Sequence, residues 1–90
     1  MNITKVVFEN ETETAIFCRV YFKVTRSISK GWFKWEYVEE EVSDLYSIDK
    51  FWLKFSSSGI ATNCRTNEYI QSDLGSLMSL AYKTKGEVVL

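Results

Sequence analysis

A chain of 90 residues is long enough for one domain with a single hydrophobic core, without obligatory disulfide or metal staples. Its 46% hydrophobic and 16% aromatic content excludes an intrinsically disordered protein. The formal net charge is −1, but residues 31–60 hold three lysines against six acidic residues. Because nucleic-acid binding normally needs a basic stripe, this distribution disfavours it. We expect one globular domain over residues 1–90.

The cysteine count and the hydropathy pattern limit the location and the metal chemistry of the protein. Neither a secretory signal nor an apolar run of the roughly 20 residues that cross a bilayer is evident. A cytoplasmic protein without a membrane partner is therefore expected. Cys18 and Cys64 are too few for a disulfide framework, and without histidine they are too few for a zinc site. The sequence predicts no cofactor and no bound metal.

The first quarter of the chain has the pattern of antiparallel strands. Residues 3–9 (ITKVVFE) are rich in β-branched side chains, and the polar residues 10–12 fit a hairpin turn. Residues 14–24 alternate strictly, which is typical of a strand with one buried face. That face carries five apolar side chains: Ile16, Cys18, Val20, Phe22 and Val24.

An aromatic strand is expected over residues 32–38, after a loop at residues 26–31. Aromatic side chains favour strands, and four of the seven residues in this one are aromatic. Alternation gives the strand one fully aromatic face: Phe33, Trp35 and Tyr37. The short connections predict that the three strands pair as an antiparallel meander over residues 3–38.

Residues 42–64 fit two patterns. Four apolar residues recur at helical spacing: Leu45, Ile48, Trp52 and Phe55. The side chains of residues 50–55 also alternate as in a strand. Residues 56–59 (SSSG) have the composition of a hairpin turn, with residues 60–62 returning as a strand. The β-rich composition of residues 50–55 favours the strand interpretation.

The last third of the chain changes to a helical period. A helix is predicted over residues 67–84, with a stop at Gly86. Gly75 falls inside this helix, where it costs roughly 1 kcal/mol against alanine, and close packing of the helix on the sheet would explain it. Residues 87–90 add a short edge strand.

The sequence therefore predicts an α+β fold: an antiparallel sheet of about four to six strands, beginning with the meander and packed on one face by a single C-terminal helix. The two cleanest apolar stripes should meet in the core. They are Ile16, Val20 and Phe22 of the second strand, and Leu74, Leu77 and Met78 of the helix.

No catalytic or nucleotide-binding motif stands out. Without histidine, general acid–base chemistry would need a carboxylate or lysine with a shifted pKa. The glutamates at residues 39–41 alternate sides on a strand, so they converge poorly on one metal ion. Residues 56–59 lack the glycines and the following helix of a phosphate-binding loop. We expect a protein that is not an enzyme.

Part of the aromatic strand matches a nucleic-acid motif. Residues 30–32 (KGW) and Tyr37 resemble the RNA-recognition consensus K/R-G-F/Y-G/A-F-V-x-F/Y, with Trp32 as the aromatic residue at the first F/Y position. Phe33 stands where the consensus has a small residue, and Lys34 stands where it has a second stacking aromatic residue. The glutamates that follow would repel phosphate. A single-stranded nucleic-acid-binding domain is therefore kept as an alternative function.

The aromatic strand and the acidic residues after it are the candidate binding surface. Burial beneath the helix is the commonest fate of an aromatic strand face. One helix covers only one face of a small sheet, so some aromatic side chains should stay exposed beside charges, as in protein interfaces. The acidic residues are either a solvated strand end or a surface that docks onto a basic partner. The candidate residues are Trp32, Trp35, Glu36, Tyr37, Glu39, Glu40, Glu41 and Asp44.

These features favour a small non-enzymatic protein-binding module that acts through an aromatic and acidic surface. An inhibitor or adaptor fits this size and surface, such as a phage protein directed at the host or a toxin-neutralising partner. The expected partner is another protein with a basic surface, and nucleic acid is a less favoured partner. A second alternative is a small homodimeric structural subunit whose aromatic residues are buried between the copies.

Overall fold

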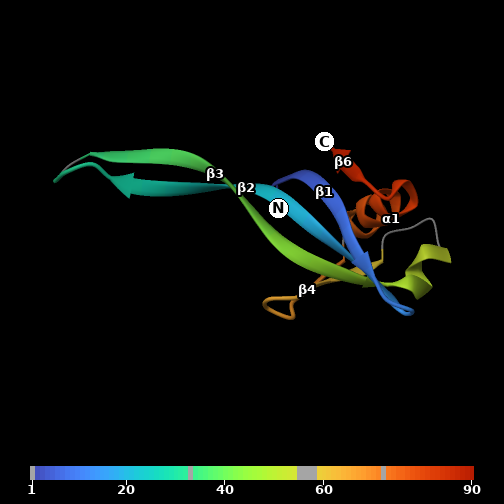
Figure 1. Cartoon of the computed structure of the whole chain (residues 1–90). Helices are drawn as coiled ribbons and strands as arrows, with labels where there is room; N and C mark the ends of the chain where they lie inside the picture. Colours follow the sequence, from blue (N-terminus) through green and yellow to red (C-terminus); the bar gives the residue numbers. More distant parts are fainter. Residues whose placement is uncertain (1, 33, 55–58, 72) are drawn as a thin grey trace.

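In the computed structural model, which describes residues 2–32, 34–54, 59–71 and 73–90, the chain forms a six-stranded antiparallel sheet with one helix against it (Figure 1). The order across the sheet is β5-β4-β3-β2-β1-β6, so β2 and β3 lie at its centre. This is the predicted α+β architecture. The elements are β1 (Asn2–Glu11), β2 (Ala15–Ser29), β3 (Trp35–Asp49), the 3-10 helix η1 (Lys50–Lys54), β4 (Ile60–Asn63), β5 (Tyr69–Gln71), α1 (Leu74–Thr84) and β6 (Glu87–Val89).

The predicted N-terminal meander is confirmed. β1 pairs antiparallel with β2, and β2 pairs antiparallel with β3 from Ala15–Asp49 to Ser29–Trp35. β2 and β3 each have 15 residues, whereas strands in globular proteins usually have about 5–6. The short edge strand expected at the C-terminus is β6, which pairs with β1. The long β2–β3 hairpin therefore runs from the centre of the sheet far beyond the other strands (Figure 1).

The core lies between α1 and one face of the sheet. It consists of ten buried side chains: Val6, Ile16, Cys18, Val20, Tyr46, Ile48, Ala61, Leu74, Met78 and Ala81. Four of the six residues predicted to meet in the core are among them. The other two, Phe22 and Leu77, are partly buried against the same cluster. Val24, the last residue of the predicted apolar row, is 36% exposed, and it is the first residue of β2 beyond the end of the β1–β2 pairing.

Two glycines let α1 approach the segment before β4. A Cβ atom on Gly75 would lie 2.5 Å from the backbone nitrogen of Gly59. A Cβ atom on Gly59 would in turn lie 2.7 Å from Cβ of Trp52. Heavy atoms do not pack at such distances, so both positions need a residue without a side chain. The close packing predicted at Gly75 is present, with the Gly59 backbone as the partner of the helix.

The predicted loop at residues 26–31 is wrong. β2 continues through Ser29, and β3 begins only at Trp35, so the chain reverses three residues later than expected and Trp32 lies in the turn. A strand with solvent on both faces needs no continuous apolar row, so its sequence has the same polar pattern as a loop. Length and pairing, which decide between the two, are not visible in the local sequence.

The predicted strand over residues 50–55 is also wrong for the part that is described. β3 runs on to Asp49, and Lys50–Lys54 forms η1. The Asp49 carboxylate accepts a hydrogen bond from the Phe51 N–H at 2.8 Å, which starts this turn. Of the turn predicted at residues 56–59, residues 56–58 lie outside the described residues. β4 returns as predicted, but it pairs with the end of β3.

The helix begins later than predicted. α1 starts at Leu74, although a start at residue 67 was expected, and its end at Thr84 agrees. Tyr69–Gln71 forms β5. The reversal before β5 is fixed by the side-chain oxygen of Asn63, which accepts hydrogen bonds from the N–H groups two and three residues later, at 2.8 and 3.2 Å. The apolar residues of β5 also fit a helical stripe, so the hydrophobic period misplaced this boundary.

Glu11, at the end of β1, ties this strand to η1 and α1. Its carboxylate lies 2.8 Å from Nζ of Lys50 and 3.2 Å from Nζ of Lys85, and it accepts a hydrogen bond from the Tyr82 hydroxyl at 2.9 Å. The hydrogen bond from Lys50, followed by those from Tyr82 and Lys85, lowers the pKa of Glu11 from 4.5 to about 2. Three elements far apart in the sequence thus meet at one carboxylate.

This contact predicts a pH-dependent stability. Because the pKa of Glu11 is lower in the folded chain, its ionised carboxylate stabilises the fold above pH 4.5, and this contribution is lost as the pH falls through about 2. We expect Glu11→Gln to be less stable than the wild type at neutral pH, with the difference shrinking as the pH falls from 4.5 to about 2. Urea unfolding followed by tryptophan fluorescence across this range measures it. A difference independent of pH would show that the charge of Glu11 plays no part.

Candidate functional site

Beyond the body of the sheet, β2 and β3 continue as a two-stranded projection, residues 23–41, called the arm (Figure 1). β1 pairs with β2 only as far as Lys23, and β4 pairs with β3 only from Tyr46 onward. Beyond Lys23, the arm therefore has no further neighbour on either edge among the described strands. The principal extents of the molecule are 54 × 24 × 21 Å, and its radius of gyration is 15.5 Å against roughly 12 Å for a compact domain of this length.

Register and alternation divide the arm into two faces. Residues directly opposite each other in an antiparallel ladder share a face, so the even-numbered residues continue the face that α1 covers in the body. This core-side face carries Val24, Arg26, Ile28, Glu36, Val38 and Glu40. The outer face carries Lys23, Thr25, Ser27, Ser29, Trp35, Tyr37, Glu39 and Glu41.

Trp35 and Tyr37 lie side by side along the outer face near the free end of the arm. Their register partners are Ser29 and Ser27, which are too small to cover an aromatic ring. Trp35 is 69% exposed and Tyr37 is 75% exposed. Burial of this face beneath the helix, the commonest fate of such a strand, does not occur, because α1 lies on the opposite face and at the other end of the hairpin (Figure 1).

The turn of the arm adds a third exposed aromatic residue. Gly31 has a φ of +105°, in the left-handed region that favours glycine. Trp32 follows it and is 94% exposed. Phe33, the remaining member of the predicted aromatic face, lies outside the described residues. The free end of the arm thus concentrates large exposed apolar side chains, as interaction sites do.

The acidic residues of the arm are partly neutralised by bases on β2 and in the turn that follows it. Three ion pairs link the two sides of the hairpin: Lys30–Glu36 at 2.6 Å, Arg26–Glu40 at 3.2 Å and Lys23–Glu39 at 3.9 Å. Residues 23–41 contain four basic and four acidic residues, so the formal charge of the arm is zero. The glutamates are therefore a weaker acidic docking surface than the sequence suggests, because ion pairs with nearby bases offset their charge. The sequence does not show this, since these bases are distant from the glutamates along the chain.

The predicted acidic residues also do not form one group. Glu39 and Glu41 lie on the outer face with the aromatic rings, whereas Glu36 and Glu40 lie on the core-side face. Only the first two can act together with Trp35 in one contact. The structure thus brings together a smaller surface than predicted: Trp32, Trp35, Tyr37, Glu39 and Glu41.

Asp44 has a structural role. Its carboxylate accepts two hydrogen bonds from the Arg65 guanidinium, both at 3.0 Å, and one from the Asn63 amide at 3.1 Å. The hydrogen bonds from Arg65 hold the pKa of Asp44 below its ordinary value, against the effect of burial. These contacts fasten the β4–β5 turn to β3, so we remove Asp44 from the candidate binding surface.

Metal ligands and cysteine thiols are the reactive groups to consider among the described residues. No group of three or more metal-ligating side chains occurs among them. Cys18 is buried in the core, and its loss of contact with water, together with the nearby charge of Glu9, raises the pKa of the thiol to about 12. Cys64 is exposed, in the turn after β4. Both cysteines are free.

The two thiols should therefore react differently. We expect one equivalent of a thiol reagent to modify the native chain at Cys64, and a second equivalent to react at Cys18 only in denaturant, because a buried neutral thiol is a poor nucleophile. Peptide mapping of alkylated protein identifies the modified residue. Equal modification of Cys18 under native conditions would show that the core opens readily around β2.

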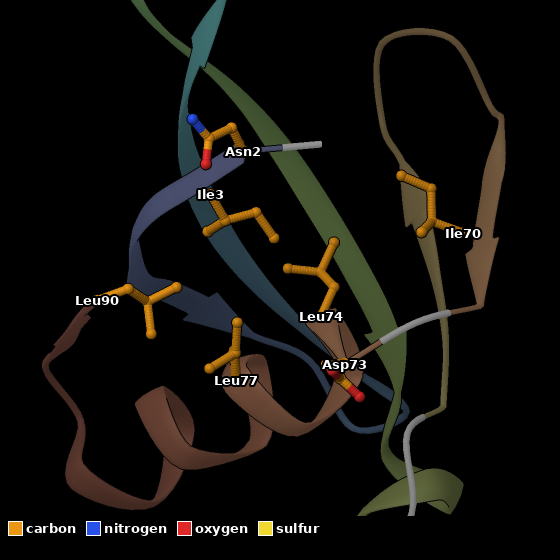
Figure 2. Close-up of a pocket in the computed structure, with 7 residues that line it drawn as sticks. All are labelled: Asn2, Ile3, Ile70, Asp73, Leu74, Leu77 and Leu90. Atoms are coloured by element: carbon orange, nitrogen blue, oxygen red, sulfur yellow. The ribbon is translucent and has the colours of Figure 1, made fainter.

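A second candidate feature is an open cavity of about 610 Å³ beside α1 (Figure 2). Its walls are mostly apolar: Ile3, Ile70, Leu74, Leu77 and Leu90, with Asn2 and Asp73 as polar neighbours. Ile3 stands opposite Phe22 in the β1–β2 ladder, so the cavity lies at the base of the arm. Sequence reasoning missed it because its walls come from both ends of the chain.

Comparison of the chain with protein-family models, with curated proteins and with solved structures finds no significant match. No helix within the described ranges combines the length and the apolar character that a bilayer crossing requires. The surface of the arm, where the exposed aromatic residues gather, is therefore the best guide to function.

Proposed function

We propose that this chain is a small non-enzymatic protein-binding module, an inhibitor or adaptor, whose binding surface is the outer face and turn of the arm. The observation that supports this most strongly is the grouping of Trp32, Trp35 and Tyr37 at the free end of a projecting hairpin, with 94, 69 and 75% of each residue exposed. Aromatic residues dominate the energetics of protein interfaces once a partner covers them. A narrow arm can also carry these rings into a cleft that a flat sheet cannot enter.

The backbone of the arm offers a second mode of contact. Among the described strands, β3 has no neighbour on the edge that faces away from β2, from Trp35 to Asp44. Its free N–H and C=O groups can pair with an extended segment of a partner. Glu39 and Glu41 favour a partner segment that carries lysine or arginine beside this edge.

Single-stranded nucleic acid is the weaker candidate. Stacking on Trp35 and Tyr37 would bring phosphates close to Glu39 and Glu41 on the same face. Three of the four basic residues of the arm are already paired with glutamates. Fluorescence anisotropy with a labelled oligonucleotide at physiological salt should show no binding tighter than about 10 μM. Sub-micromolar affinity with a steep salt dependence would overturn the protein-binding proposal.

Comparative capture tests the proposal directly. The immobilised wild-type chain, the outer-face variant W35S/Y37S and the control Tyr69→Ser are exposed to the same cell lysate. Tyr69 is a matched control because it is 76% exposed but lies on β5, in the body of the sheet. We expect at least one protein to be retained by the wild type and by Tyr69→Ser and lost from the outer-face variant. Retention that is unaffected by W35S/Y37S would contradict the proposal.

A further inference from the structure

The core-side face of the arm carries an apolar stripe that α1 does not cover. Val24, Ile28 and Val38 continue along the arm the apolar row that is buried in the body. Val24 and Ile28 are each 36% exposed. At its base the stripe meets Phe22, which stands opposite Ile3, a wall of the cavity beside α1 (Figure 2). Apolar surface therefore runs from near the free end of the arm to this cavity.

The molecule also exposes more surface than a compact monomer of its mass. Its accessible surface is 6217 Å², whereas a folded monomer of 10.5 kDa is expected to expose roughly 5,400 Å². The excess of about 800 Å² equals the area that each partner contributes to an interface of standard size. We attribute this excess to the arm, since both its faces and, beyond Lys23, both its edges are open.

The charges on the core-side face are complementary to a second copy of themselves. Arg26 and Glu40 lie on this face 3.2 Å apart, in adjacent rows of the ladder. When two arms pack by this face and run antiparallel, a two-fold axis near Thr25 brings Arg26 of each copy beside Glu40 of the other. Arms that run parallel bring the two copies of Arg26 together, which charge repulsion opposes. The charge pattern therefore selects the antiparallel arrangement.

We propose that the core-side face of the arm binds a second copy of this chain in an antiparallel, two-fold dimer. The apolar stripes of the two arms pack against each other. Ile28 of each arm lies over Phe22 of the other copy, at the mouth of the cavity beside α1. Phe22 and Ile28 are six residues apart, so they are separated by about 20 Å along the strand at about 3.3 Å per residue, and the two arms overlap over this length. One symmetric interface thus covers both stripes and the mouths of both cavities.

This dimer leaves the outer face of each arm free. Trp35 and Tyr37 point away from the core-side face, so the dimer presents two copies of the proposed binding surface, on opposite sides of the paired arms. Such a bivalent arrangement raises the apparent affinity for a partner that is itself repetitive or oligomeric. Self-association and partner binding therefore depend on different residues, and each can fail without the other.

Sedimentation equilibrium between about 1 and 200 μM tests the dimer, a range that covers micromolar dissociation constants. We expect the wild type to dimerise, and V24S/I28S to raise the dissociation constant by at least about tenfold. The outer-face variant W35S/Y37S removes comparable apolar surface from the same arm and should change the constant by no more than about twofold. Because the arm lies outside the core, all three chains should keep the same urea unfolding midpoint when measured as monomers.

A charge-exchange experiment tests the antiparallel arrangement. Arg26→Glu and Glu40→Arg each place like charges across the two-fold axis, so each variant alone should be monomeric. An equimolar mixture restores an opposite charge at both contacts and should form heterodimers. A wild type that stays monomeric at about 200 μM would overturn the proposal, since an interface of standard size should hold well below that concentration. Equal losses from the two faces, or variants that do not rescue each other, would overturn it as well.

Discussion

Gly75→Ala is expected to lower the free energy of unfolding by about 2 kcal/mol or more, although alanine is intrinsically the better helix former by roughly 1 kcal/mol. The added Cβ would lie 2.5 Å from the backbone nitrogen of Gly59 and 3.0 Å from its carbonyl oxygen. Backbone atoms cannot rotate away as a side chain can. Gly59 is also confined on its other side, by Trp52 and by Ile48. α1 would have to move off the sheet, which opens the core around Leu74.

Gly86→Ala is the matched control for this prediction. A Cβ at Gly86 would meet its nearest neighbour, the carbonyl oxygen of Thr84, at 3.8 Å, an ordinary contact distance. We expect its unfolding free energy to stay within about 0.5 kcal/mol of the wild type. Urea unfolding of the three chains, followed by tryptophan fluorescence, makes the comparison. A Gly75→Ala chain as stable as the wild type would show that α1 does not rest on the Gly59 segment.

Trp35→Ala is expected to weaken the complex with a captured protein by about 2 kcal/mol or more, a factor of about 30 in affinity. The ring is 69% exposed in the free chain, and Ser29 across the ladder gives it no cover, so a partner can bury most of it. The loss should appear mainly in the dissociation rate, because close contacts form after the encounter. Surface plasmon resonance with Tyr69→Ala as control measures this, and the control should stay within about twofold of the wild type.

The two glutamates on the same face should act on the other rate. Reversing Glu39 and Glu41 to lysine is expected to slow association with a basic partner and to flatten its dependence on salt, since exposed charges steer the encounter. If these reversals and the aromatic truncations all leave the affinity within about twofold while the unfolding midpoint is unchanged, the arm is scaffold only. The interface would then have to be sought on the body, in η1, β5 or α1.

The parts of the fold that the sequence predicted correctly are those encoded by local period. The alternation over residues 14–24 placed Ile16 and Val20 in the core, and both are fully buried. The α+β class and the meander followed from the same alternation and from short connections. That Trp35 and Tyr37 share a face also followed directly from their spacing.

The parts that could not be predicted depend on partners distant in the sequence. Asp44 was assigned to the binding surface, but Arg65, 21 residues away, occupies its carboxylate. The glutamates at 39–41 alternate between the two faces of β3, as their spacing predicted, but the sequence did not show that bases of β2 lie opposite two of them. Periodicity describes which side of an element a residue faces, and it carries no information on what lies across the ladder.

The arm itself was hidden by the same limit. Val24 was placed in the buried row because alternation continues through it, but burial ends where α1 and β1 end. The length of the hairpin is set by how far β2 and β3 stay paired. The polar composition of residues 26–31 predicted a loop there, so this length was underestimated. The sequence therefore predicted only that some aromatic side chains would stay exposed because one helix could not cover them all. It did not predict that they would lie at the end of a projecting arm.

Hydrogen–deuterium exchange of the wild-type chain, alone and with the captured protein, tests most directly whether the arm is the binding surface. The amides on the edge of β3 that faces away from β2, from Trp35 to Asp44, have no strand partner among the described residues. A protein bound there should therefore slow the exchange of the arm strongly. We expect slowed exchange over residues 34–41, with β5, α1 and β6 exchanging as in the free chain. Slowed exchange confined to the body, with the arm unchanged, would contradict the proposed function.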